Sequence, residues 1–221
     1  MVERVKTVAT QSFQVWLNSD LEELGWRGPP FIASAFVKPF DTWCDMAHVI
    51  PEEGWTRPPK TSVYFCGVLA DLPGEPYGDT CAYAALRDEE VRRNAIAFLQ
   101  RDVRHLWPKA FDADGEFRWE LLVDPAGQAD LCQPALKGPA RFATQYWRAN
   151  VNPSDRHALA LPGSQQHRIS PLDMTYDNMT IAGDWTDCGF QRGLRGGGRD
   201  VRTVGRARTG GRSGARGDHR L

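Results

Sequence analysis

The stretch NMTIAGDWTDCGF, residues 178–190, decides the fold, because a short apolar run ends there at Gly183-Asp184 and a second glycine follows at position 189. Residues 178–182 are predicted to form a buried strand that breaks into a tight turn, with a helix expected next. Glycine at such a break lets the backbone approach a ligand closely, and a helix N-terminus attracts anionic groups. The alternative is an ordinary turn, which Gly-Asp also forms after a strand.

The same residues also match a known pattern. Ala182-Gly183-Asp184-Trp185-Thr186, with Gly189 after it, resembles the C-terminal flavin-binding segment of FAD-dependent amine-oxidase-like oxidoreductases, a superfamily that includes phytoene desaturases and hydroxysqualene dehydroxylases. The resemblance implies FAD as the cofactor and hydride removal from a C–N or C–C bond as the reaction. The residues that it assigns to cofactor contact are Ala182, Gly183, Asp184, Trp185, Thr186 and Gly189.

Directly after Phe190 the chain departs from the family pattern, which continues there as a helix of glycine and other small residues. Residues 191–202 read QRGLRGGGRDVR instead. If residues 190–202 are back-translated with GC-rich codons and one cytosine is removed after the Phe190 codon, the shifted frame reads Phe-Asn-Ala-Gly-Cys-Val-Glu-Ala-Ala-Val-Met-Ser-Gly. This is the missing family helix. We therefore hypothesise a one-base insertion at this junction, in the gene or in its reported sequence.

The charge of the chain divides at the same place. Residues 191–221 carry nine Arg and two Asp, a net charge of +7, whereas residues 1–190 carry a net charge of −8. The tail has almost no apolar residue to bury and is predicted to be disordered. The sequence shows no secretory signal and no apolar run that would span a bilayer, and its five cysteines include no CxxC pair, so reduced thiols in the cytoplasm are expected.

The resemblance implies an α+β fold, with helices packed on a mixed sheet in a substrate domain and a C-terminal flavin-contacting strand of an FAD/NAD(P)-binding fold, and hydrophobic periodicity predicts the individual elements. Helices are expected over residues 3–17, 19–25 and 88–107. The second of these is expected to begin with a capping box formed by Ser19 and Glu22. Strands are expected at 31–37, 61–69, 117–123 and 157–161, with an extended segment at 141–151. The nearly continuous apolar run 61–69 is typical of a strand that is buried on both faces.

The resemblance extends loosely to residues 10–17 and 141–161, which are similar to the substrate domain of the family. It implies a domain division into a substrate-domain-like region 1–175, an FAD-contacting segment 176–190 and the Arg/Gly-rich tail 191–221. In the family, the face near the flavin carries the substrate contacts, which makes Tyr146, Trp147 and Arg148 the candidates here. Aromatic core packing is the alternative for two of them. The histidines show no metal-ligand spacing and no catalytic motif is present, so catalytic residues are unassigned and no metal is expected.

The intact family begins with a Rossmann GxGxxG motif that seats the FAD pyrophosphate, and residues 1–221 contain no such signature. The chain is therefore interpreted as the C-terminal fragment of an FAD-dependent oxidoreductase that is inactive alone. Its substrate stays open between an amine, a polyene and another lipid. Two alternatives remain: a binding module or split-enzyme subunit whose FAD domain lies on another chain, and an RGG-like tail that binds RNA. Nine Gly and nine Arg in the tail favour RNA, but it has no aromatic residue.

Overall fold

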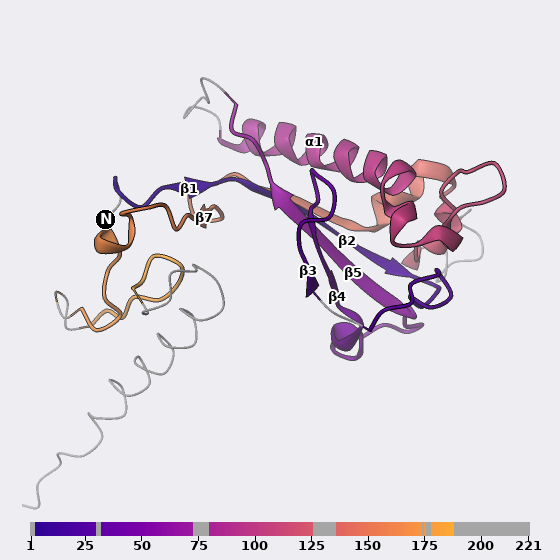
Figure 1. Cartoon of the computed structure of the whole chain (residues 1–221), viewed down its shortest axis with the longest axis horizontal. Helices are drawn as coiled ribbons and strands as arrows, with labels where there is room; N and C mark the ends of the chain where they lie inside the picture. The colour runs from indigo at the N-terminus through magenta and orange to yellow at the C-terminus, as the bar shows by residue number, and fades with distance from the viewer. Residues whose placement is uncertain are drawn as a thin grey trace, which may run out of the picture. The chain divides into compact units, whose positions relative to one another are not determined.

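Strands β2 (Thr10–Leu17) and β5 (Thr61–Val68) form the centre of a five-stranded sheet in a computed structural model of the chain (Figure 1). The structure describes residues 3–29, 32–72, 80–125, 136–173, 175 and 178–187. The strand order is β3-β4-β5-β2-β6, where β3 is Ile32–Ala33, β4 is Thr42–Asp45 and β6 is Tyr146–Asn150. All of these strand pairs are antiparallel, so this sheet is not mixed, although the α+β class is confirmed.

The helix predicted over residues 3–17 is wrong, because residues 10–17 form strand β2. Phe13 lies opposite Phe65 and Val15 lies opposite Val63, and all four side chains are fully buried. Side chains alternate between the two faces of a strand, so these odd-numbered residues share one face of the sheet. The apolar residues of this segment fit a helical stripe, but the alternation of Phe13, Val15 and Leu17 is the pattern that decides the structure.

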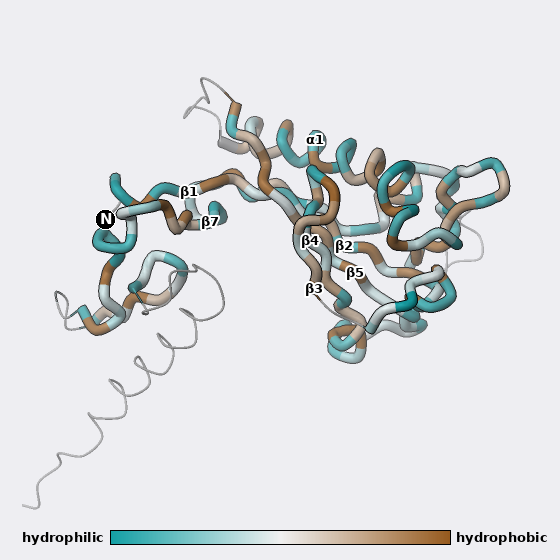
Figure 2. Tube along the Cα trace, viewed as in Figure 1, coloured by the Kyte–Doolittle hydropathy of each residue, from teal (hydrophilic) through white to brown (hydrophobic). Residues whose placement is uncertain are grey.

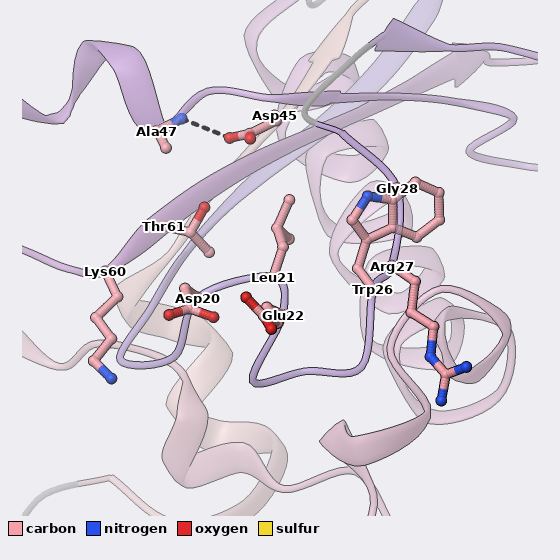
Figure 3. A pocket seen from close by; sticks show the side chains of 10 residues that line it. All are labelled: Asp20, Leu21, Glu22, Trp26, Arg27, Gly28, Asp45, Ala47, Lys60 and Thr61. Carbon is pink, nitrogen blue, oxygen red and sulfur yellow. Dashed lines mark hydrogen bonds between the residues drawn. The ribbon is translucent and has the colours of Figure 1, made fainter.

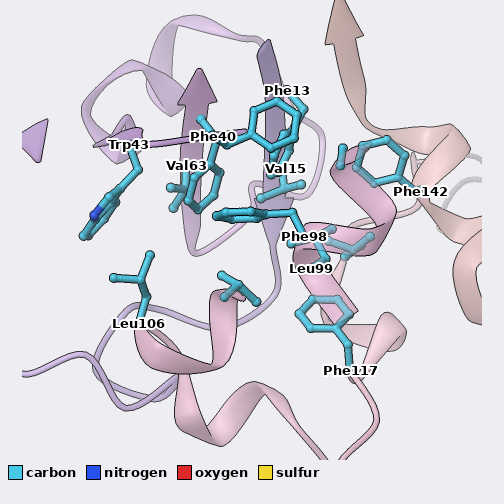
Figure 4. Packing of buried hydrophobic residues seen from close by; sticks show 14 of the residues in the cluster. Phe13, Val15, Phe40, Trp43, Val63, Phe98, Leu99, Leu106, Phe117 and Phe142 are labelled. Atoms are coloured by element: carbon cyan, nitrogen blue, oxygen red, sulfur yellow. The ribbon is translucent and has the colours of Figure 1, made fainter. Parts of the chain in front are cut away.

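Helix α1 (Thr80–Arg101) covers this face of the sheet. Its Phe98 packs edge-on against Phe13 and Phe65, with ring centroids 6.0 and 5.3 Å apart, and Figure 4 shows it among the strand side chains. The buried helix face was predicted correctly. The helix, however, begins before the predicted residue 88 and ends at Arg101, and the chain then continues in the short 3-10 helices η2 (Val103–His105) and η3 (Pro108–Ala110).

Apolar and polar residues alternate along α1 (Figure 2). From Val91 to Leu99 the apolar residues Val91, Ala95, Phe98 and Leu99 are buried, whereas earlier in the helix Leu86 is 58% exposed and Arg87 is buried. The arginines of the helix lie mostly outside its buried face, and Arg92 pairs with Glu89 at 3.4 Å. This confirms the predicted solvated face with interleaved charges. The completely buried aromatic residues of this core are Phe13, Phe40, Phe65, Phe98, Trp107 and Phe142.

Several short elements differ from the prediction. In residues 19–25 there is a turn instead of a helix, and its reciprocal cap is one residue later than predicted: the Glu23 N–H donates to Asp20 at 2.8 Å and the Asp20 N–H to Glu23 at 3.1 Å. The strand expected over 117–123 is wrong, because Trp119–Leu121 form the 3-10 helix η4. The predicted strand 31–37 is reduced to β3, and 3-10 helices occur at η1 (Ala47–Glu52) and η5 (Gly138–Thr144).

The chain divides into two compact units, one formed by residues 9–155 and the other by residues 1–8 and 156–221. The larger unit holds the five-stranded sheet and α1. In the smaller unit, β1 (Thr7–Val8) pairs with β7 (His157–Ala158), and η6 (Gln165–His167) follows. The predicted strand 157–161 is therefore present only at its start. The tail 191–221, predicted to be disordered, lies outside the described residues.

No helix in the described part of the chain is both long enough and apolar enough to cross a membrane.

Candidate functional site

The face of the sheet opposite α1 carries a row of polar and aromatic side chains. Strand register places Cys44, Tyr64, Gln14 and Tyr146 next to one another across β4, β5, β2 and β6. Cys44, Tyr64 and Gln14 are partly buried, and Tyr146 is 49% exposed. We call this face the open face, because α1, the one α-helix in the described ranges, packs on the other side of the sheet.

A second row lies beside the first, with Thr42, Cys66, Ser12 and Arg148 in register across the same four strands. Ser12 is buried, while the other three are partly exposed. Next to these rows the Gln14 amide donates a hydrogen bond to the Ser62 hydroxyl at 2.9 Å. The open face therefore presents hydroxyl, phenol, amide and thiol groups, whereas the face under α1 is mainly apolar, with Gln11 hydrogen-bonded there to Asn94 of α1.

Burial changes the ionisation of two groups on the open face. It raises the pKa of the Tyr64 phenol, and hydrogen bonding with Ser12 opposes the shift. Burial also raises the pKa of the Cys66 thiol, and a hydrogen bond with Tyr64 reduces this increase in pKa. Since both pKa values start well above 7 and move upward, Tyr64 and Cys66 are neutral hydrogen-bond donors at neutral pH.

The charge on the open face is already paired. The Arg148 guanidinium lies 3.4 Å from Asp88 of α1 and 3.6 Å from Asp155. Asp88 also accepts the backbone N–H of Ala149 at 2.6 Å, so it links the helix to the outer edge of β6. Hydrogen bonding with Asn152 lowers the pKa of Asp155, which keeps that carboxylate charged beside Arg148.

The structure separates the three residues predicted to contact substrate. Tyr146 and Arg148 lie on the open face. Trp147 points to the other side, where its ring packs against Phe142 with centroids 5.5 Å apart and the Arg92 guanidinium lies 5.8 Å from the ring. Core packing therefore accounts for Trp147, while Tyr146 and Arg148 stay substrate-contact candidates.

The strand predicted at residues 178–182 does not form. Asn178, Met179 and Thr180 are exposed, and the bridge of this region is made later, between Thr186 and Ile169. A strand needs a neighbour for its N–H and C=O groups, and the described residues provide one only at Ile169. There the Asp187 N–H donates to the Ile169 carbonyl at 2.8 Å, and the Ile169 N–H donates to the Trp185 carbonyl at 3.2 Å.

The predicted tight turn at Gly183 is present. Gly183 has φ +119°, a conformation that favours glycine, and open space surrounds the position where a Cβ would lie. The Thr186 hydroxyl and N–H both donate to the Gly183 carbonyl, at 2.8 and 3.1 Å. The buried Arg168 guanidinium donates to the Asp184 carbonyl and, at 3.4 Å, to the Leu159 carbonyl. These bonds fix the turn from inside.

The turn has backbone donors available. Within the described residues, the N–H groups of Gly183, Asp184 and Trp185 have no hydrogen-bond partner. Consecutive N–H groups beside a glycine that leaves open space are the kind of backbone donors that bind an anionic or electron-rich oxygen. Asp184 also lies 4.0 Å from His157, and Ala182 is exposed next to the turn. Gly189 lies outside the described residues.

Sequence reasoning missed Ser12, Gln14, Cys44, Tyr64 and Cys66 as candidate site residues. A signal was available in residues 61–69, where Ser62, Tyr64 and Cys66 alternate with Val63 and Phe65. The nearly continuous apolar run predicts a strand that is buried on both faces, and this is wrong, because the alternation places Tyr64 and Cys66 on the partly exposed open face. In the described part of the chain, no three His, Cys, Asp or Glu side chains gather as a metal-ligand set.

The chain was compared with family models, with curated proteins and with solved structures, and none of the three comparisons finds a match.

Proposed function

We propose that this chain contributes the substrate-facing sheet and a cofactor-contacting turn to an FAD-dependent oxidoreductase. The observation that carries the proposal is the turn at Gly183. The residues whose sequence resembles a flavin-binding segment form a turn in which the N–H groups of Gly183, Asp184 and Trp185 have no hydrogen-bond partner among the described residues, and internal hydrogen bonds hold that turn. The sequence pattern and the local geometry support the same role independently.

In this proposal the N–H groups of Gly183, Asp184 and Trp185 would hold an oxygen of the cofactor, and Thr186 and Arg168 would keep the turn in place. Bound FAD would supply the redox chemistry by accepting a hydride from a C–N or C–C bond. The protein groups would bind and orient. This division of labour is compatible with the absence of a catalytic motif in the sequence.

The open face would form one wall of the substrate site. Cys66 would donate a hydrogen bond in its neutral form, the Tyr64 hydroxyl is engaged with the Cys66 sulfur, and Gln14 has an amide oxygen that can accept a hydrogen bond. Tyr146 adds an aromatic ring at the edge, while Arg148 is neutralised by Asp88 and Asp155. Such a wall orients a substrate by hydrogen bonds and ring contacts rather than by a free charge.

The proposal requires the adenosine-binding half of the site to come from polypeptide outside these 221 residues, since they contain no GxGxxG motif. That polypeptide would be encoded either upstream in the same gene or as a separate chain. In the first case the chain is a fragment of one longer protein, and in the second it is one subunit of a split enzyme. The DNA sequence on either side of the gene distinguishes these two cases.

The test expresses the complete locus, with one base removed at the Phe190 codon junction, and measures bound FAD from its visible absorbance. We expect about one FAD per chain, as for a flavoenzyme with a stoichiometric cofactor. The variant Gly183→Ala should bind FAD about tenfold more weakly, because a side chain strains the backbone of the turn by roughly 1–3 kcal/mol.

The matched control is Gly115→Ala, since Gly115 also has positive φ and open space where a Cβ would lie but belongs to the loop of residues 112–116, far along the chain from the turn. It should retain full FAD occupancy. A product without FAD would contradict the proposal, and so would equal FAD affinities of the two variants.

A further inference from the structure

A hollow of about 700 Å³ lies at one end of the sheet in the larger unit, and no residue of the two rows on the open face is among its lining residues. Loop residues 20–28 form one side of it, and the ends of β4 and β5 form the other (Figure 3). Leu21 and Thr61 are its buried lining residues. Its charged lining residues are Asp20, Glu22, Arg27, Asp45 and Lys60.

The aromatic wall of the hollow is rigid. The Trp26 indole N–H donates to the Pro29 carbonyl at 3.3 Å, and the ring meets Trp43 edge-on with centroids 5.0 Å apart. The backbone of Gly28 lies against the same ring, so close that a Cβ there would be 2.7 Å from a ring carbon. A fixed indole is a good surface for an apolar or cationic ligand, because its place is determined before binding.

Two carboxylates of the hollow are anchored by the backbone. One oxygen of Asp20 accepts the Glu23 N–H at 2.8 Å, and one oxygen of Asp45 accepts the Ala47 N–H at 2.8 Å. Each carboxylate therefore keeps its second oxygen for a ligand. Lys60 and Glu23 form an ion pair at 2.5 Å that is neutral as a whole, so Arg27 is the lining cation left against the carboxylates of Asp20, Glu22 and Asp45.

We propose that this hollow binds an organic cation, an ammonium or guanidinium group carried on an apolar body, with the cation between Asp20 and Asp45 and the body against Trp26. Three carboxylates line the hollow against two cations, one of them paired with Glu23 outside the lining. The surplus is negative, and an apolar floor and indole complement the rest of such a ligand. This proposed cation site does not depend on the proposed flavin function, and each proposal has its own test.

Three probes with the same ring but different charge test the proposal on the full chain: phenethylammonium, 2-phenylethanol and phenylacetate. Binding is measured by saturation-transfer NMR and titration. We expect phenethylammonium to bind with a dissociation constant on the order of 1 mM, as a small fragment in an open site does, and the other two to bind at least about tenfold more weakly. Added salt should weaken the cation's binding.

The variants D20N and D45N keep the anchoring oxygen and remove the charge. Each should weaken phenethylammonium binding about fivefold. The control Asp114→Asn removes an exposed carboxylate elsewhere and should leave binding unchanged. Gly28→Ala pushes on the Trp26 ring without altering any charge, and it should also weaken binding. Equal binding of the three probes, no binding at all, or unchanged binding by the D20N/D45N double variant would overturn the proposal.

Discussion

At Gly67 there is no room for a side chain. It lies in β5, where a Cβ would come within 2.0 Å of the Pro39 carbonyl oxygen. Pro39 belongs to the connection between β3 and β4, and a backbone atom cannot move aside as a flexible side chain can. Gly67→Ala should therefore lower the free energy of unfolding by about 3 kcal/mol, measured by urea denaturation.

Gly54→Ala is the control for that substitution. Gly54 has φ +70° and no atom near the position of a Cβ, so it tests backbone strain without steric overlap. It should cost about 1 kcal/mol. Equal losses for the two variants would show that the close contact with Pro39 does not constrain Gly67.

The ionisable groups of the open face predict a pH dependence of stability. Burial raises the pKa of Cys66 above its ordinary value of 9.0 and that of Tyr64 above 10.0. In the unfolded chain these groups lose protons at lower pH, so the folded state binds more protons between the unfolded and folded pKa values. Their contribution is fully present below about pH 9, the unfolded value for the thiol, and is lost as pH rises through the folded values.

Urea unfolding at pH 7, 9 and 10.5 measures this effect. The free energy of unfolding should fall across the series, and the fall should be smaller in Tyr64→Phe and in Cys66→Ala, because each variant removes one titrating group. The same slope in both variants as in the unaltered chain would exclude these two groups as its cause.

Among the elements, α1 and β6 are joined by Asp88, whose carboxylate accepts the Ala149 N–H at 2.6 Å. Asp88→Ala leaves that edge-strand donor without its partner and breaks the pair with Arg148. We expect a loss of about 1.5 kcal/mol in the free energy of unfolding. Asp88→Asn retains an acceptor and should lose less, while Glu89→Ala on the exposed side should lose under about 0.5 kcal/mol. A loss from Glu89→Ala as large as from Asp88→Ala would contradict this role.

The sequence predicted α1 better than β2, and the reason lies in their surroundings. Val91, Ala95, Phe98 and Leu99 form one continuous buried stripe, a pattern that only a helix gives. In β2, Phe13, Val15 and Leu17 alternate with residues of the open face. The apolar Trp16 lies on the open face, which is only partly exposed, and it makes the segment resemble a helical pattern. The strand expected at 178–182 failed for another reason, since local sequence does not determine whether a partner strand is present.

The candidate site was predictable to a similar degree. The turn at Gly183 follows from Gly-Asp after an apolar run, which is a local signal. The open face depends on register between strands that are distant in sequence: Gln14, Tyr64 and Tyr146 become neighbours only through the pairing of β2 with β5 and β6. No local pattern specifies which residues of distant strands become neighbours. The alternation of Tyr64 with Val63 and Phe65 indicates two different faces of the strand, but it does not show that Tyr64 lies beside Gln14.

For the whole molecule, the prediction concerns how much FAD the purified chain binds. The turn at Gly183 offers a few backbone donors, whereas most contacts of an FAD-binding fold come from its Rossmann half, whose motif is not in this sequence. The purified 221-residue chain should therefore not bind FAD stoichiometrically, as measured by equilibrium dialysis and visible absorbance. An equimolar, flavin-coloured preparation would contradict this prediction.

The most direct test of the proposed flavin-dependent oxidoreductase is the DNA sequence of the locus, from upstream of the Met1 codon through the junction after the Phe190 codon. The account predicts an upstream frame that encodes GxGxxG, and a shifted frame after Phe190 that reads Asn-Ala-Gly-Cys-Val-Glu-Ala-Ala-Val-Met-Ser-Gly. Codons after Phe190 that give no such helix in the shifted frame, with no GxGxxG frame upstream or in a neighbouring gene, would contradict the proposal of a flavin-dependent oxidoreductase.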